Sequence, residues 1–142
     1  MKSSRTKQVK EPIKLLIVDD EEGYVNVLAN RLALRGVNVS KAYNGTEAIR
    51  TLRKNDFDVA VLDLKMEDMD GLEVLKIFKK MDPDLMVIML TGHGSAQAAS
   101  DGITLGAFDY LTKPCDFSEL LEKINKAYLK HKRLQKETQQ NS

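Results

Sequence analysis

The strongest constraint on the fold is a short run of apolar residues, 59–63, that ends in a carboxylate. The run reads Val-Ala-Val-Leu-Asp, and a polar, turn-rich segment and then a helical pattern follow it. A bounded apolar run of this length is typical of a strand buried on both faces of a parallel sheet. Asp63, at its carboxyl end, then lies where open parallel α/β sheets bind their ligands.

The same order, an apolar run followed by a helical pattern, recurs along the chain. Strands are predicted at 14–18, 37–42, 59–63, 85–90 and 106–112, and helices at about 25–32, 44–52, 70–81, 95–105 and 116–131. The helix at 95–105 contains Ser100, Asp101, Gly102 and Thr104, which are poor helix formers. Five strand–helix units predict an α/β fold, a doubly wound (βα)5 three-layer sandwich whose parallel five-stranded sheet has helices on both faces.

Length and composition predict a single soluble domain. The chain has 142 residues, 42% hydrophobic and 30% charged, and lacks the roughly 20-residue apolar stretch of a membrane span. We expect a flexible N-terminal tail at 1–12, a folded domain at 13–131 and a polar C-terminal tail at 132–142, with His131 in a fraying segment without a chemical role. No signal peptide is evident, which favours a cytoplasmic location. Cys115, the single cysteine, excludes an internal disulfide.

Charge is spread unevenly along the chain. The formal net charge is +1, but both ends are basic and the centre is acidic. An acidic folded part argues against a broad nucleic-acid-binding face, so we expect neither direct nucleic-acid binding nor membrane association.

Polar side chains follow four of the predicted strands at their carboxyl ends. They are Asp19 and Asp20, Asp63, Thr91 and Lys113. Each could be an ordinary cap or turn residue, but their joint placement at one edge of the sheet favours a site. Clustered carboxylates repel one another, and a hard cation such as Mg²⁺ relieves that repulsion. With a lysine and a hydroxyl opposite, the chemistry indicated is phosphoryl transfer to an aspartate.

Four segments resemble the receiver domain of two-component response regulators, in the right order and spacing. They are Leu16-Ile17-Val18-Asp19-Asp20-Glu21, Val61-Leu62-Asp63 followed by Met69-Asp70-Gly71-Leu72, Leu90-Thr91-Gly92-His93-Gly94, and 106–114 ending in Thr112-Lys113-Pro114. The resemblance runs from about residue 13 to 128. It implies the flavodoxin-like strand order 2-1-3-4-5, which the receiver domains share.

The resemblance also implies a role for each residue at the predicted edge. Asp63 would be the phosphoacceptor. Asp20, Asp63 and the backbone carbonyl of Lys65 would bind Mg²⁺, with Mn²⁺ as a possible substitute, and Asp19 would act through a coordinated water. Lys65 and His93 would tune hydrolysis of the acyl phosphate.

Three further residues would read the phosphoryl group. Lys113 would pair with its oxygens, and Thr91 would donate its hydroxyl to it and move on activation. Tyr110 would couple to Thr91 by turning from exposed to buried. The Lys113–Pro114 peptide is expected to be cis, which would aim the lysine inward.

The resemblance implies a signalling protein, with no enzymatic activity beyond self-phosphorylation and self-dephosphorylation. A sensor histidine kinase or a phosphotransfer protein would supply the phosphoryl group. The predicted output surface is the face formed by the fourth helix (95–105), the fifth strand and the fifth helix, which would bind a downstream protein, an output domain absent from this chain, or a second copy in a dimer.

One residue departs from the family pattern. Glu67 stands where the family usually has proline, and we expect a more mobile or more acidic loop with the phosphoacceptor chemistry retained. Two other functions compete: a Mg²⁺-dependent phosphohydrolase with Asp63 as nucleophile, and an unphosphorylated receiver-like interaction module. The first usually needs a second carboxylate two residues after the nucleophile, where this chain has Lys65. A dinucleotide binder is excluded, because acidic residues rather than a glycine-rich loop follow the first strand.

Overall fold

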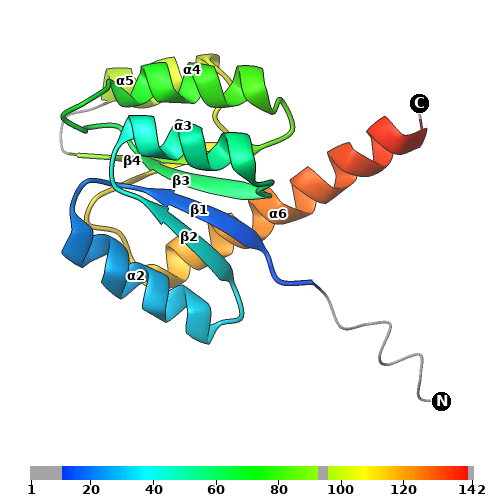
Figure 1. Ribbon diagram of the computed structural model, residues 1–142, viewed down its shortest axis with the longest axis horizontal. Coiled ribbons are helices and arrows are strands. Elements are labelled where there is room, and N and C mark those ends of the chain that lie inside the picture. The colour runs from blue at the N-terminus through cyan, green and yellow to red at the C-terminus, as the bar shows by residue number, and fades with distance from the viewer. Residues whose placement is uncertain (1–10, 93–95, 141–142) are drawn as a thin grey trace.

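The computed structural model describes residues 11–92 and 96–140. Five parallel strands form one sheet in the order β2-β1-β3-β4-β5, with helices on both faces (Figure 1). The strands are β1 (Lys14–Val18), β2 (Asn38–Ala42), β3 (Val59–Asp63), β4 (Met86–Thr91) and β5 (Asp109–Thr112), and the helices are α2 (Glu22–Leu34), α3 (Gly45–Lys54), α4 (Gly71–Met81), α5 (Ala96–Thr104) and α6 (Phe117–Gln140). The predicted fold class and strand order are confirmed. The predicted N-terminal tail lies almost wholly outside the described residues.

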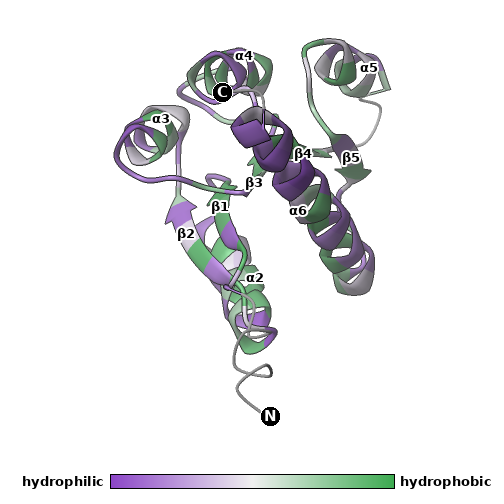
Figure 2. Cartoon of the chain, turned by 90° about the vertical axis from the view of Figure 1, so that its right-hand side faces the viewer, coloured by the Kyte–Doolittle hydropathy of each residue, from purple (hydrophilic) through white to green (hydrophobic). Residues whose placement is uncertain are grey.

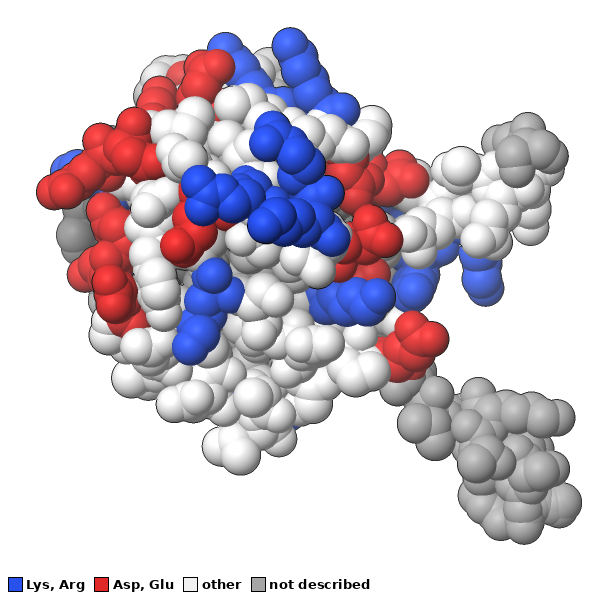
Figure 3. All heavy atoms as spheres, viewed as in Figure 1, with Lys and Arg blue, Asp and Glu red and all other residues white. Residues whose placement is uncertain are grey.

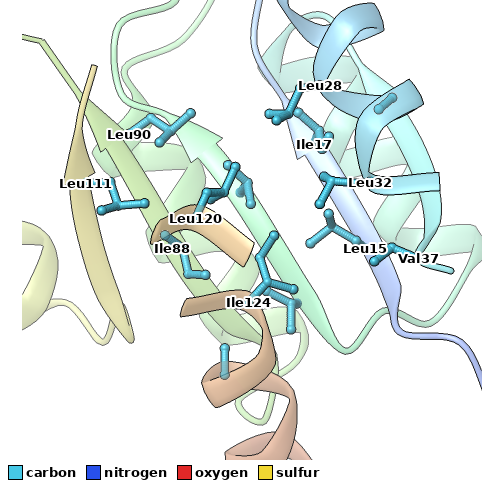
Figure 4. Close-up of a cluster of buried hydrophobic side chains, with 14 of the residues drawn as sticks. Leu15, Ile17, Leu28, Leu32, Val37, Ile88, Leu90, Leu111, Leu120 and Ile124 are labelled. Carbon is cyan, nitrogen blue, oxygen red and sulfur yellow. The ribbon is translucent and has the colours of Figure 1, made fainter. Parts of the chain in front are cut away.

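Each face of the sheet carries its own hydrophobic core, because successive side chains of a strand point to opposite faces. In β1, Leu15 and Ile17 pack with α2 and α6, in the cluster shown in Figure 4. Leu16 and Val18 pack on the other face, with residues of α3 and α4. A chain of this pattern needs both layers of helices to bury its strands.

The strand β3 lies at the centre of the sheet, between β1 and β4. All five of its residues are buried, Asp63 included. The edge strand β2 is only partly buried, as its alternating sequence predicted. The central strand therefore ends in a buried carboxylate, whereas the carboxylate of an ordinary turn residue would be exposed to solvent.

Two helices end at a glycine with positive φ. Gly36 (φ 84°) follows α2 and Gly106 (φ 109°) follows α5. In α5 the N–H of Ala107 donates to the carbonyl of Gly102, and that of Gly106 to the carbonyl of Ile103, the pattern of a Schellman motif. Because residues 105–107 complete this helix ending, β5 begins at Asp109 and is shorter than the predicted strand 106–112.

The prediction that the last helix frays from Lys132 is wrong. The helix α6 continues to Gln140 and projects beyond the body of the domain (Figure 1), where its surface is hydrophilic (Figure 2). Its extension is rich in residues that favour helix. His131, expected in a frayed tail, is 2% exposed and contacts two other segments. None of the helices in the described part of the chain has the length and apolar composition to cross a bilayer.

Candidate functional site

The predicted carboxylates meet at the carboxyl end of the sheet. Asp19 follows β1 directly and Asp63 ends β3, so the pairing of these neighbouring strands brings them together. Carboxylate oxygens of Asp19, Asp20 and Asp63 lie within 4.8 Å of one another. In Figure 3 acidic side chains gather along the left-hand edge, where the strands end. Asp19 and Asp63 are buried, whereas Asp20 is exposed.

Lys113, which follows β5, reaches into this cluster. Its Nζ lies 2.8 Å from Asp19 Oδ2, 2.8 Å from Glu21 Oε1 and 3.6 Å from Asp63 Oδ2. The ring of Tyr24 also contacts the ammonium group, whose nitrogen is 4.8 Å from the ring centroid. The peptide between Lys113 and Pro114 is cis, as expected. One cation thus faces several carboxylates.

Burial and charge shift the pKa values of these groups. Burial raises the pKa of Asp63 to about 6, and the neighbouring carboxylates of Asp19 and Asp20 add to the effect, while a hydrogen bond from the Lys65 N–H and the charge of Lys113 oppose it. Burial alone would lower the pKa of Lys113, but its contacts with Asp19 and Glu21 raise it. Contact with Lys113 also lowers the pKa of Glu21. The contacts of Lys113 thus favour its charged form, whereas burial and the neighbouring carboxylates make Asp63 harder to ionise than a free carboxyl group.

The donor set fits a hard divalent cation. Asp19 Oδ2 is buried, and it accepts no hydrogen bond from the described residues although Lys113 Nζ lies beside it. The three carboxylates lie close enough together to share one such cation, directly or through water. Several carboxylates face the single positive charge of Lys113, so a bound cation would offset the negative charge that Lys113 alone does not neutralise. Oxygen ligands of this kind favour Mg²⁺ or Mn²⁺ over softer metals.

Thr91 ends β4, next to the partner of Asp63 in the sheet register, and Tyr110 lies on β5, which pairs with β4. The hydroxyl of Thr91 is buried and donates to the carbonyl of Leu111 over 3.4 Å. Tyr110 is 43% exposed. The predicted switch residues are thus a buried hydroxyl held by β5 and an outward-facing tyrosine on the same strand.

The loop between β3 and α4 is held at several points. The N–H of Lys65 donates to Asp63 Oδ1 over 3.2 Å, and Lys65 pairs with Asp70 in an isolated antiparallel bridge. The Asp70 side chain caps α4 by accepting from the N–H of Leu72. Glu67 is exposed. The carbonyl of Lys65, predicted as a metal ligand, therefore belongs to a short turn that begins at Asp63, the predicted phosphoacceptor.

Sequence reasoning missed several participants. Glu21 and Tyr24 contact Lys113 although about 90 residues separate them along the chain. The only hint in the sequence was that both residues follow Asp19 and Asp20 closely along the chain. His93, predicted to tune hydrolysis, lies outside the described residues.

Comparison with known proteins places these features in a family. The chain matches the response regulator receiver domain over residues 15–125. It is 36% identical over 119 residues to the transcriptional regulatory protein ZraR of Salmonella typhimurium, and 38% identical over 117 residues to the transcriptional regulatory protein GlrR of Escherichia coli. These alignments cover 84% and 82% of this chain but only 27% and 26% of the relatives. The chain thus spans about a quarter of their length.

Solved structures agree with this match. A response regulator receiver domain protein from Clostridium thermocellum has a TM-score of 0.83 at 35% identity, with 86% of this chain and 98% of that chain covered. NtrX from Brucella abortus has a TM-score of 0.83 at 28% identity, with 88% of this chain but 29% of NtrX covered. The likeness to NtrX thus covers only part of that protein.

Proposed function

The chain belongs to the response regulator receiver domain family, and from that premise we propose that it is a phosphorylation-activated signalling domain that accepts a phosphoryl group on Asp63. The observation that carries the proposal is the placement of Asp63. It is a buried carboxylate at the end of the central strand, with two other carboxylates and the ammonium group of Lys113 around it.

The proposed reaction is transfer between a phosphohistidine and the Asp63 carboxylate. A carboxylate oxygen attacks the phosphorus atom, and the bond between phosphorus and the imidazole nitrogen of the donor breaks. The electron pair of that bond stays on the nitrogen, which takes up a proton from solvent. Bound at Asp20, Asp63 and the Lys65 carbonyl, with Asp19 acting through water, Mg²⁺ would neutralise negative charge on the carboxylates and the phosphoryl oxygens.

The residues of the chain supply positioning and charge. Lys113 lies 3.6 Å from Asp63 and carries a fixed positive charge, so it can pair with a phosphoryl oxygen after a small movement. Thr91 holds its hydroxyl in a 3.4 Å contact with Leu111, a long hydrogen bond that a charged acceptor would outcompete. Both donors would then turn toward Asp63 only when it carries the phosphoryl group.

The proposed movement of Thr91 and Lys113 would change the conformation of the face formed by α5, β5 and α6. Thr91 leaves a carbonyl of β5 in the proposed change, and Tyr110 on the same strand is exposed enough to turn inward. The short α5 contains residues that form helices poorly, so its repacking costs little. We propose that this face binds the output partner, another domain of a longer regulator, or a second copy of the chain.

Incubation with acetyl phosphate tests the phosphoacceptor. We expect a mass increase of one phosphoryl group that requires Mg²⁺, occurs in the wild type and in Asp116→Asn, and is absent in Asp63→Asn. Asp116 is an exposed carboxylate after β5 and serves as the matched control. Lack of phosphorylation in the wild type, or its persistence in Asp63→Asn, would contradict the proposal.

Amide hydrogen exchange tests the switch. Beryllofluoride, which mimics a phosphoryl group on a carboxylate, should change protection across residues 92–112 in the wild type only when Mg²⁺ is present. The Asp63→Asn variant supplies the control. Unchanged protection over this segment in the wild type would show that the face does not respond.

Three further parts of the proposal follow from the family. A sensor histidine kinase or a phosphotransfer protein would be the donor, the domain would act in the cytoplasm, and the domain itself would not bind nucleic acid. Incubation with phosphorylated histidine kinase, followed by detection of label on Asp63, tests the first.

A further inference from the structure

The loop that leads from Asp63 to α4 is fastened to a different helix by one side chain. Asp68 Oδ1 accepts from the N–H of Gly45 over 2.9 Å. Its Oδ2 accepts from the N–H and from the hydroxyl of Thr46, both over 3.1 Å. Gly45 and Thr46 are the first two residues of α3, so this carboxylate bridges from the phosphoacceptor loop to the start of α3.

The bridge uses backbone groups that a helix cannot satisfy by itself. The first four N–H groups of an α-helix have no partner within the helix. In α3, the N-cap Asn44 accepts from the N–H of Glu47 through its side chain, and Asp68 accepts from the N–H groups of Gly45 and Thr46. The helix N-terminus favours a negative charge, and the hydrogen bond from Gly45 holds the pKa of Asp68 below its usual value. The bonds are therefore charge-assisted and of the stronger kind.

A second contact fixes the same part of the loop. A Cβ atom at Gly45 would lie 2.9 Å from Met69 Sδ, so the loop packs directly on the glycine backbone. The loop also closes on itself through the bridge between Lys65 and Asp70. Its two ends are joined and its tip is attached to α3, which leaves the turn that contains the Lys65 carbonyl little freedom to move.

We propose that Asp68 is a positioning residue for the divalent cation site. By tying the loop to α3 it holds the Lys65 carbonyl beside Asp63, so the cation meets a preformed ligand set. The Asp68 bridge restrains by hydrogen bonding a loop in which Glu67 departs from the proline that the family resemblance led us to expect. This inference rests on the proposed function only in taking the Lys65 carbonyl as a ligand.

The test measures binding of Mn²⁺ by the loss of its free-ion electron paramagnetic resonance signal. We expect Asp68→Ala to raise the dissociation constant about tenfold, the lower end of the effect of removing a residue that orients a metal ligand. Amide exchange at residues 64–70 should rise in the same variant, because the tip of the loop is released.

Two controls separate positioning from other effects. Asn44→Ala removes a cap from the same end of α3 without touching the loop, so it should lower stability while leaving Mn²⁺ affinity within twofold of the wild type. Glu67→Gln removes a neighbouring negative charge without removing the anchor, and it should also bind within twofold.

The outcomes distinguish this inference from the proposed function. Wild-type affinity in Asp68→Ala overturns the inference, and so does an equal loss in Asn44→Ala or in Glu67→Gln. In either case phosphorylation of the wild type on Asp63 would still stand. Conversely, a wild type that binds Mn²⁺ but takes no phosphoryl group from acetyl phosphate defeats the proposed function while leaving the role of Asp68 intact.

Discussion

Replacing His131 with leucine is expected to destabilise the domain through loss of a buried polar clamp. His131 is on α6, and its Nε2 lies 3.1 Å from Asp58 Oδ1, just before β3. Its Nδ1 lies 2.8 Å from the carbonyl of Asp84, between α4 and β4. Both partners are acceptors, so both ring nitrogens must donate, and the bonded ring is an imidazolium. The clamp thus joins α6 to two other segments.

The size of the effect follows from burial. The side chains of His131 and Asp58 are 3% and 12% exposed. Removing one partner of a buried ion pair costs about 3–5 kcal/mol, and partial access of water to Asp58 places this case near 3 kcal/mol. For a chain of this size that is roughly a 12 °C fall in the melting temperature.

The pH dependence has a definite sign. Burial alone would lower the pKa of His131, but its contacts with Asp58 and with the Asp84 carbonyl, helped by the charge of Asp82, raise it. The stabilisation is therefore complete below the unfolded pKa of about 6.5, and it is lost as pH rises through the folded pKa. Burial opposes ionisation of Asp58, but its hydrogen bonds with His131 and the Lys14 N–H lower its pKa overall. On the acid side, the ion pair is therefore lost only when the pH falls through this lowered pKa.

Urea denaturation of the wild type and His131→Leu at pH 6 and pH 9 measures this. The difference in unfolding free energy should be largest at pH 6 and shrink toward pH 9. A double-mutant cycle with Asp58→Asn, which keeps an acceptor for the Lys14 N–H, isolates the pair. The chain has two histidines, so His93→Gln is the control and should leave the pH dependence unchanged. An equal difference at both pH values would refute the imidazolium assignment.

Two further predictions concern the carboxylate cluster and the loop after it. In EDTA at pH 7.5, Asp63→Asn should raise the free energy of unfolding by about 2 kcal/mol. The pKa of Asp63 is raised to about 6 in the folded state, so ionised Asp63 destabilises the fold as pH rises above the unfolded pKa, and the full cost is reached above pH 6. Thermal melts should also show that Mg²⁺ stabilises the wild type more than the variant. Gly71→Ala should destabilise by about 1–3 kcal/mol in urea titrations, because its Cβ would collide with the Leu64 backbone, whereas Gly23→Ala, with open space around it, should be neutral or stabilising.

The fold was predictable because its signals are local. Each strand is a bounded apolar run, and parallel strands deliver their last residues to one edge whatever the loops do. That rule alone placed Asp19, Asp63 and Lys113 together, and their contacts in the structure agree with it. The chemical roles of these residues are inferred from the family and stay predictions.

The features that escaped prediction depend on contacts between distant segments. Asp68 and Gly45 are 23 positions apart, and nothing near Asp68 marks it as a cap for a preceding helix. Local reasoning about Glu67 predicted a more mobile or more acidic loop, and it could not include the hydrogen bonds that Asp68 makes to α3. The polar sequence at the end of α6 likewise suggests a fraying terminus, because the contacts of His131 with Asp58 and Asp84 cannot be read from the sequence.

The two ends of β3 contact different groups, so the prediction about stability and the prediction about phosphorylation can be tested separately on one chain. Asp58, just before the strand, contacts His131 of α6, and Asp63, at the end of the strand, is the proposed phosphoacceptor beside Lys113. All five residues of β3 are buried, so we expect the strand to act as a rigid spacer rather than a moving part. A change at His131 should thus lower stability while leaving Mg²⁺-dependent phosphorylation intact below the melting temperature. Coupled loss of both would mean that the strand transmits strain from one end to the other, and the switch would then include α6 along its whole length.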